Sequence, residues 1–431
     1  MSRLRRRRLL LAGAGAAVAA AVLRPSVSGA PHDGYFSALA RALRRSERPT
    51  DATTPVMVID RDRLLNNIGQ VMALKSPERP LRLVAKSLPS LPLLDLIAQR
   101  ADTQRQMVFN LPYLLQTATE RPTSELLMGK PLPAGAAAAF YQRFKGGGFT
   151  PARQLQWLVD TPERLAEYQQ LARGLGQPLR VNLEIDVGLH RGGFASQEAL
   201  AQALRMLRAE PLLEFAGMMG YDAHVTRVPD LPGVRRAAES HAKQVYADYK
   251  ARALAALPAA AQQAHSLTWN AAGSPTFHLY SGQTAANEVA VGSAFVMPTE
   301  FDMPHLAACQ PACFIATPVL KSGYFQLPAG VEWAGSALKL WDRNLRHGVF
   351  IHGGQWPADP VSPAGLAANS QYGLSPNQQV MVGSGQQQLQ VGDTVFFRPH
   401  KSEAMLQQFG DLVIVAGGEV VDHWPVMPPA P

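Results

Sequence analysis

The chain has 431 residues, of which 47% are hydrophobic and 17% are charged, a balance typical of a globular protein long enough for two domains. Its formal charge is +8, but six arginines and no acidic residue lie in the first 30 residues, so the remainder carries only +2. A nearly neutral body lacks the broad basic surface that phosphate contacts need, which argues against nucleic-acid binding.

The first 30 residues have the pattern of an export signal. A cluster of arginines precedes an apolar stretch from Leu9 to Leu23, and the small residues Ser28 and Ala30 predict cleavage near Ala30. The run RRRLL also approximates a twin-arginine pattern, and that route exports folded proteins. We therefore expect a periplasmic or exported protein that meets the membrane only through this signal. An uncleaved membrane anchor is the main alternative, although fifteen apolar residues are short for a span.

Strand-like runs alternate with helical stretches from about residue 50 to residue 302. PVMVID (55–60) reads as a strand, and the residues after it have helical spacing. The same rhythm continues through LRLVA (81–85), QWLVD (156–160), PLRVNLEIDVG (178–188), LEFAGMMGYDAH (213–224), SLTWNAAGS (266–274) and NEVAVGSAFV (287–296). Seven or eight such units predict an α/β fold, a (β/α)₈ barrel.

The pattern changes after residue 303. Short β-rich runs, such as DTVFFRP (393–399), are separated by Gly, Pro, Asn and Ser. We predict a smaller all-β domain over residues 303–431, joined by part of residues 31–49. Its two cysteines, Cys309 and Cys313, are expected to be buried as small apolar residues. A disulfide is the alternative, whereas a zinc site needs more soft ligands.

Several reactive side chains follow predicted barrel strands, where barrel enzymes carry their active sites. Lysine is rarely fully buried, so Lys86, at the end of an apolar run, is a snorkelling amine, an ion-pair partner or a desolvated nucleophile. The other residues so placed are Arg191, Tyr221, His224 and the segment 273–276.

In combination, six motifs resemble the fold-type III pyridoxal-phosphate enzymes. Within that group they are similar to the D-threonine aldolase/D-serine dehydratase branch of the alanine racemase-like superfamily. The resemblance covers about residues 50–425. Its motifs are TPVMVIDRDRLLNNI (54–68), RLVAKS (82–87), LEIDVGLHRGGF (183–194), GYDAH (220–224), AAGSPT (271–276) and NEVAVGSAFVM (287–297).

The resemblance implies that Lys86 forms a Schiff base with pyridoxal 5′-phosphate. An amine does so only when deprotonated, and desolvation favours that form. Arg191 would contact the pyridoxal ring and tune its electron withdrawal. A salt bridge from Arg191 to Glu184 or Asp186 is the alternative.

The resemblance also gives roles to the later motifs. Tyr221 and His224 would pack on the ring and handle protons near the substrate, a structural histidine being the alternative. Gly273, Ser274 and Thr276 would bind the phosphate, unless the segment is an ordinary turn. Glu288 and Gly292 are expected to be structural.

The chain departs from this branch in its β domain. Relatives end with a Pro-x-His-x-Cys or Pro-x-His-x-Asp element whose two ligands hold a divalent metal. In FRPHKSEAML, His400 aligns, but Ser402 stands where the thiolate or carboxylate is expected. Neutral serine is a poor ligand for Zn²⁺ or Mn²⁺, and Glu403 could substitute only after a one-residue shift. A metal at His400 stays open, and an acid–base or structural histidine is favoured.

The leading functional hypothesis is a pyridoxal-phosphate lyase, an aldolase or dehydratase, acting on a D-3-hydroxy amino acid. An amino-acid racemase of the alanine racemase type is the second candidate. A non-catalytic periplasmic binding protein on the same fold is the third. The resemblance further implies a homodimer that takes a small amino-acid substrate.

Overall fold

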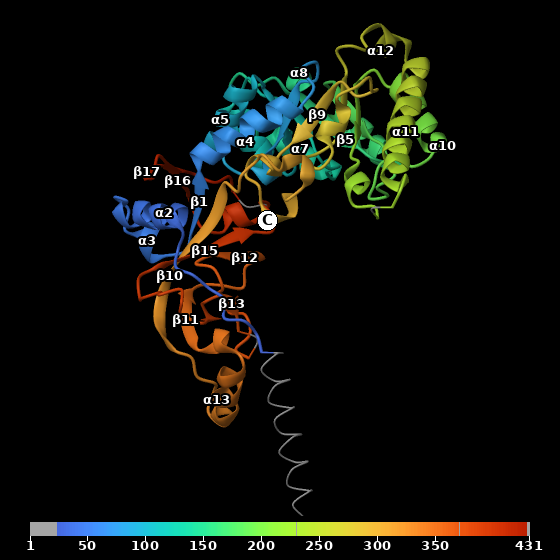
Figure 1. Cartoon of the computed structure of the whole chain (residues 1–431). Helices are drawn as coiled ribbons and strands as arrows, with labels where there is room; N and C mark the ends of the chain where they lie inside the picture. Colours follow the sequence, from blue (N-terminus) through green and yellow to red (C-terminus); the bar gives the residue numbers. More distant parts are fainter. Residues whose placement is uncertain (1–23, 230, 370, 429–431) are drawn as a thin grey trace, which may run out of the picture. The chain divides into compact units, whose positions relative to one another are not determined.

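The computed structural model describes residues 24–229, 231–369 and 371–428 (Figure 1). The arginine cluster and apolar run of the predicted export signal lie outside these residues. The chain divides into two compact units, described separately below. The barrel unit comprises Ile59–Cys313, His400–Ile414 and Asp422–Pro431, and the β unit comprises the described residues up to Val58 together with Phe314–Pro399 and Val415–Val421.

In the described chain, eight parallel strands form a closed barrel, as predicted. Each strand pairs with the next, and the last closes on the first through Leu81 opposite Val289. The side chains of these strands are mostly buried, as expected for a barrel covered by helices. The strands are β2 (Leu81–Val84), β3 (Arg105–Val108), β4 (Glu125–Met128), β5 (Leu155–Val159), β6 (Leu179–Glu184), β7 (Leu213–Gly220), β8 (Thr268–Ala271) and β9 (Glu288–Val291).

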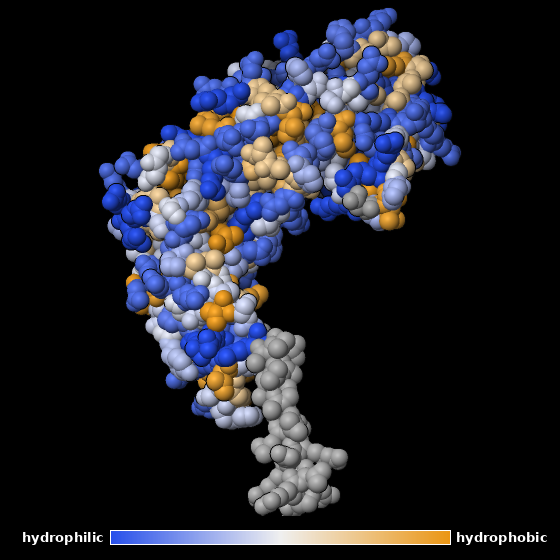
Figure 2. All heavy atoms as spheres, in the orientation of Figure 1, coloured by the Kyte–Doolittle hydropathy of each residue, from blue (hydrophilic) through white to orange (hydrophobic). Residues whose placement is uncertain are grey.

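Helices surround the barrel, and the surface they present in Figure 2 is mostly hydrophilic. Local sequence signals start and stop them. In α9, for example, Thr161 caps the first turn, Pro162 occupies the first helical position, and Gly176 ends the helix with a φ of +64°. The helices are α4 (Arg61–Leu74), α5 (Leu91–Ala101), α6 (Leu111–Glu120), α7 (Ala134–Arg143), α8 (Pro151–Gln154), α9 (Pro162–Leu175), α10 (Gln197–Ala209), α11 (Val234–Ala256) and α12 (Pro258–Gln262).

A buried ion pair lies inside the barrel. The Arg82 Nε atom is 2.6 Å from Glu288 Oε1, and neither side chain is more than 1% exposed. Arg105 and the Asn270 amide also contact the Glu288 carboxylate, at 3.0 and 2.9 Å. Burial alone would raise the pKa of Glu288, but Arg82, Arg105 and Asn270 outweigh that effect and lower it. Glu288 is therefore structural, as predicted.

The β unit is built on a sheet that runs in the order β13-β14-β11-β10-β1-β16-β17, with β15 and β12 attached beside β10. This confirms a second, β-rich part of the chain. Its strands are β1 (Val56–Asp60), β10 (Cys313–Tyr324), β11 (His347–His352), β12 (Ala358–Ser362), β13 (Ala367–Ala368), β14 (Gln378–Gly383), β15 (Thr394–Pro399), β16 (Leu412–Ala416) and β17 (Glu419–Trp424). Its helices are α2 (Gly34–Arg45), α3 (Thr50–Thr53) and α13 (Glu332–Trp341).

The structure differs from the expected organisation in three places. The strand of PVMVID, β1, belongs to the sheet of the β unit and not to the barrel. The barrel instead uses β3 and β4, which the sequence pattern does not single out. Residues 400–411 and 425–428, expected in the β domain, belong to the barrel unit.

Three further features bear on the sequence predictions. Cys309 and Cys313 are buried and are not joined in a disulfide, as expected. Ser28 and Ala30, at the predicted cleavage site, are bound within the β unit: the Ser28 amide donates to Asn344 at 2.8 Å, and the Ala30 amide donates to the Ala364 carbonyl at 3.4 Å. None of the helices in the described residues is both long enough and apolar enough to cross a membrane.

Candidate active site

Lys86 lies just beyond the carboxyl end of β2. It occupies the middle of a single 3₁₀ turn, Ala85–Ser87, whose other two residues are buried. The Lys86 side chain is 43% exposed, its Nζ atom is 3.7 Å from Glu403 Oε1, and it lies 4.9 Å from the centre of the Phe109 ring. The desolvation expected from the sequence is therefore incomplete, and an ion pair holds the amine at the rim of the barrel.

The Lys86 amine lines a cavity whose wall consists entirely of residues of the barrel unit. The free space around it, counted together with the solvent at its mouth, is about 560 Å³. Met107, Phe109, Met219 and Phe301 make part of its wall apolar. Its polar and charged lining residues are Lys86, Ser87, Arg191, Tyr221, Asn270, Ser274, Ser293 and Glu403.

Arg191 lies over an aromatic ring, and its charge also acts on the Glu184 carboxyl group without forming an ion pair. Its guanidinium carbon lies 5.0 Å from the centre of the Tyr221 ring. Asp186, its suggested salt-bridge partner, instead accepts from the Gly188 and His190 amides and contacts the His190 ring at 2.8 Å. Within the described residues, no ion pair joins Arg191 to Asp186 or Glu184. The guanidinium is thus held at the cavity by the aromatic ring.

The loops after β8 and β9 line the cavity partly with glycine, so that their backbone borders it directly. A Cβ atom on Gly273 would lie 2.5 Å from Tyr221 Cε2, and one on Gly292 would lie 2.8 Å from Ser87 Cβ. Ser274 Oγ joins these loops by accepting from the Gly292 and Ala294 amides at 3.2 and 3.1 Å. Glycines at strand ends let the backbone come close to a bound group, which is one feature of phosphate-binding loops.

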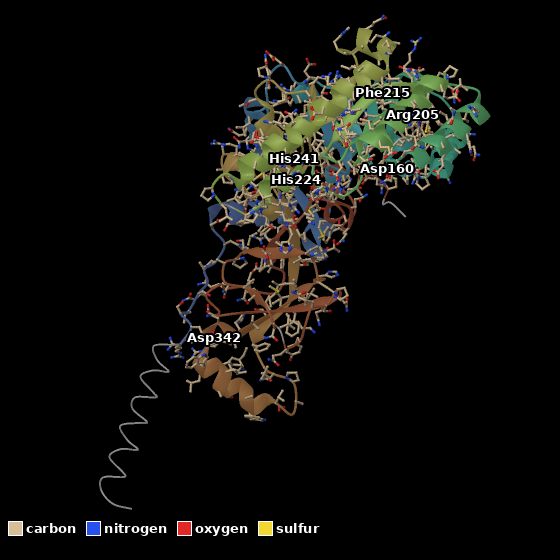
Figure 3. All side chains as sticks on the ribbon, turned by 90° about the vertical axis from the view of Figure 1, so that its right-hand side faces the viewer. Asp160, Arg205, Phe215, His224, His241 and Asp342 are labelled. Carbon is tan, nitrogen blue, oxygen red and sulfur yellow. The ribbon has the colours of Figure 1, made fainter. Side chains whose placement is uncertain are left out.

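Two predicted residues do not line the cavity. Thr276 is fully buried; its hydroxyl donates to Asp222 at 2.5 Å and accepts from the Gly273 amide at 3.3 Å, so it supports the loop from behind. His224 lies beside His241, as Figure 3 shows, and close to Gly188. Burial lowers the pKa of His224, which favours the neutral ring. A catalytic role for His224 stays a prediction.

The loop after β15 brings Glu403, and not Ser402, into the cavity. Ser402 is fully buried, and its hydroxyl lies 3.0 Å from Ser293 Oγ. His400 is half-buried and does not line the cavity; its carbonyl accepts from the Glu300 amide at 3.2 Å. Among the described residues, no group of three or more His, Cys, Asp or Glu side chains is arranged to hold a metal ion. The donor set here does not fit the metal site of the resembling branch.

Glu184, at the end of β6, has a strongly perturbed carboxyl group. Burial raises its pKa to about 7; Asp160 and Asp186 act in the same direction, and Arg191 opposes them. The folded protein therefore holds a proton on Glu184 at pH values where the unfolded chain has lost it. Stability from this group should fall as the pH rises from about 4.5 to about 7.

Replacing Glu184 with glutamine should remove that pH dependence and stabilise the fold at pH 8. The gain in the free energy of unfolding is at most about 3 kcal/mol. Because the side chain is only half-buried, we expect a gain of about 1–2 kcal/mol. Urea unfolding of both proteins at pH 5 and pH 8 measures the difference. Glu167→Gln, on the exposed side of α9, should show no such change. Equal stability of Glu184→Gln and the wild type at pH 8 would contradict this assignment.

The sequence did not reveal all of the cavity. Glu403 was considered only as a shifted metal ligand, and Asn270 was not singled out because it lies within a strand. The Asn270 amide is fixed by Glu288, while its Oδ1 atom is buried with no hydrogen-bond partner among the described residues. Phe109 directly follows β3, a strand that the sequence pattern does not indicate. No local sequence signal distinguishes these residues from core residues.

The lining residues fit pyridoxal phosphate. The site offers a primary amine at Lys86, a cation at Arg191, an aromatic face at Tyr221 and glycine-bearing loops at Gly273 and Gly292. The unpaired Asn270 Oδ1 atom can accept a hydrogen bond from a bound group. Lys86 and Arg191 are the residues that would hold its reactive carbon and its ring.

Three solved structures share this fold at low sequence identity. D-threonine aldolase from Filomicrobium marinum superposes with a TM-score of 0.63 at 18% identity, covering 87% of this chain and 97% of that one. D-threo-3-hydroxyaspartate dehydratase from Delftia sp. HT23 gives 0.66 at 16%, covering 87% and 98%. Alanine racemase from Clostridium difficile gives 0.62 at 12%, covering 86% and 98%.

Sequence comparisons point to the same group. An alanine racemase from Limosilactobacillus fermentum is 38% identical over 74 residues, which span 17% of this chain and 20% of that relative. The chain thus matches only about a fifth of the length of this relative. The family model of the alanine racemase N-terminal domain matches residues 59–300, more than half of the chain. The protein therefore belongs to the alanine racemase N-terminal domain family, whose enzymes depend on pyridoxal phosphate.

Proposed function

We propose that this protein is a pyridoxal-phosphate enzyme that acts on an amino acid, and specifically a D-3-hydroxy amino acid lyase. The observation that carries the proposal is the position of Lys86, at the end of β2, in one cavity with Arg191, Tyr221, Gly273 and Ser274. When bound, the cofactor would withdraw electrons from the amino acid and weaken the bonds at its Cα atom.

The side chains of the site have separate tasks in this proposal. The Lys86 amine binds the cofactor and gives or takes the proton at Cα. Arg191 and Tyr221 orient the ring, since the guanidinium is held against the tyrosine. The loops at Gly273 and Gly292 lie against the phosphate, because the two glycines let their backbone approach it closely. Phe109, Phe301 and Met219 make the cavity apolar and exclude water from part of it.

An amino-acid racemase is the second candidate, and one observation favours it. Racemisation needs two acid–base groups at Cα, and the cavity lining contains two such groups, Lys86 and Glu403. The fold itself does not separate the two, because it is shared with an alanine racemase as well as with an aldolase and a dehydratase.

Product assays separate these functions. Purified protein loaded with pyridoxal phosphate would be given D-threonine, D-serine and both enantiomers of alanine. An aldolase releases an aldehyde from D-threonine or D-serine, and a dehydratase releases ammonia and a keto acid from them. A racemase instead interconverts the two enantiomers of alanine. A protein that takes up no cofactor would contradict both enzymatic functions and leave the binding-protein alternative.

Replacing Gly273 with alanine should weaken cofactor binding. The new methyl group would meet the Tyr221 ring at 2.5 Å, so the ring or the loop must move. Such overpacking costs about 1–3 kcal/mol, equivalent to a rise of roughly 5- to 150-fold in Kd. Titration of cofactor-free protein measures this, with Gly135→Ala as the control because open space surrounds Gly135 in α7. Unchanged affinity of Gly273→Ala would show that this loop does not bind the cofactor.

We further propose that the protein is exported by its N-terminal segment and acts as a homodimer. The composition of residues 1–30 and the family resemblance support these two points. Intact mass of the protein purified from the periplasm, and its mass in solution by light scattering, test them. Retention of all 431 residues in a cytoplasmic monomer would contradict both.

A further inference from the structure

Glu403 is the only carboxylate among the described residues that line the cavity. Its Oε1 atom accepts a hydrogen bond from Ser87 Oγ at 2.9 Å and lies 3.7 Å from Lys86 Nζ. The Glu403 side chain is 33% exposed, so it borders both the amine and the open part of the cavity. A base and an ammonium group thus face the same space.

The backbone of the loop explains why Glu403 faces the cavity. Ser402 is anchored inward by its contact with Ser293, and Met405 and Leu406 are buried just beyond. Between them, Ala404 has a φ of +63°, a conformation that L-residues rarely adopt and that costs of order 1–3 kcal/mol. With this turn at Ala404, the Ser402 side chain points into the protein interior, and the Glu403 side chain points into the cavity.

This placement replaces a metal ligand with a Brønsted group. In the resembling branch, a cation held by a histidine and a cysteine or aspartate lies near the substrate hydroxyl on Cβ. Here the second ligand position is Ser402, a buried neutral hydroxyl that is already hydrogen-bonded. The adjacent carboxylate of Glu403 reaches the cavity from the same loop. The Glu403 carboxylate can accept or donate a proton at the Cβ oxygen, whereas a metal ion would polarise that oxygen.

We propose that Glu403 is the base for a metal-independent retro-aldol cleavage, an inference that rests on the proposed lyase function. The Glu403 carboxylate takes the proton of the Cβ hydroxyl group. The Cα–Cβ bond breaks as the aldehyde C=O bond forms, and the electron pair left on Cα takes a proton from the Lys86 ammonium. From threonine this gives acetaldehyde and glycine. The proton on Glu403 then returns to the Lys86 amine, which restores the ion pair seen in the structure.

The two groups act on different bonds, and this separation provides the test. Exchange of the Cα proton with solvent depends on Lys86, whereas cleavage of the Cα–Cβ bond also depends on Glu403. In Glu403→Gln, the kcat for D-threonine cleavage should fall at least about 100-fold. The rate of deuterium exchange at Cα of glycine and D-alanine should stay within about threefold of wild type. Glu403→Asp should recover part of the cleavage, and Glu167→Gln should match the wild type.

The metal is tested without reference to activity. Elemental analysis and calorimetric titration with Mn²⁺ and Zn²⁺ should show no stoichiometric metal on the holoenzyme. Treatment of the wild type with a chelator should leave D-threonine cleavage unchanged.

Four results would overturn the inference. Glu403→Gln could cleave D-threonine at the wild-type rate, or it could lose Cα exchange and cleavage to the same extent. The wild type could contain a stoichiometric metal ion that cleavage requires. Finally, the wild type could exchange Cα protons without cleaving D-threonine. A wild type that takes up no pyridoxal phosphate, or exchanges no Cα proton, overturns the proposed function as well.

Discussion

Replacing Lys86 with alanine is expected to abolish both the covalent attachment of the cofactor and the reaction. No other amine lines the cavity among the described residues. The variant loses a nucleophile and an acid–base group together, and the second loss alone is worth about 10²–10⁴-fold, so we expect a reduction on the order of 10³-fold or more. Visible absorbance of the loaded protein and its turnover of D-threonine measure the two effects.

A matched control exists in the barrel unit. Lys401 is also an exposed lysine beside a glutamate, with its Nζ atom 3.5 Å from Glu300 Oε1, but it does not line the cavity. Lys401→Ala should keep both the absorbance and the turnover. If Lys86→Ala kept the turnover of the wild type, Lys86 would not be the cofactor lysine, and the proposed site would be wrong.

Replacing Arg82 with alanine is expected to destabilise the barrel unit by about 3–5 kcal/mol. The substitution removes the main partner of a fully buried carboxylate, leaving Glu288 with Arg105 and Asn270. It also frees the Gln106 and Glu125 carbonyls, which Arg82 Nη1 contacts at 3.1 and 2.8 Å. Few native proteins can lose that much stability and stay folded at physiological temperature.

Chemical denaturation followed by circular dichroism measures the loss. Arg227→Ala is the control, because Arg227 is 69% exposed and 3.9 Å from Glu300, and such surface pairs contribute at most about 1 kcal/mol. Because the pKa of Glu288 is lowered, the stability that its carboxylate contributes is present above the unfolded pKa and is lost as the pH falls through the folded one. A loss below about 1 kcal/mol in Arg82→Ala would contradict a structural role for the pair.

The local motifs predicted the barrel and the position of Lys86 well, because both depend on short-range patterns. An apolar run of period two followed by a turn indicates the end of a strand, whichever strand it pairs with. The same pattern does not tell which sheet a strand joins. PVMVID (55–60) is therefore recognisable as a strand, yet it pairs in the sheet of the β unit, through contacts with residues far along the chain.

The rest of the site depends on backbone turns that the sequence does not specify. Glu403 is 317 residues beyond Lys86, and its direction is set by an alanine with positive φ, where glycine would be the usual signal. The GYDAH motif similarly places Tyr221 in the cavity lining but not His224, three residues later. Thr276 shares a motif with Ser274 but is hydrogen-bonded to Asp222 behind the loop.

Borohydride reduction followed by peptide mass mapping tests the central claim most directly. The protein would be loaded with pyridoxal phosphate, reduced to fix any covalent link to a lysine, digested, and compared with unreduced protein. We predict a single modified peptide, with the phosphopyridoxyl group on Lys86 of the LRLVAKSLPS segment (81–90). A modification on any other lysine, or none at all, would contradict this account of the site.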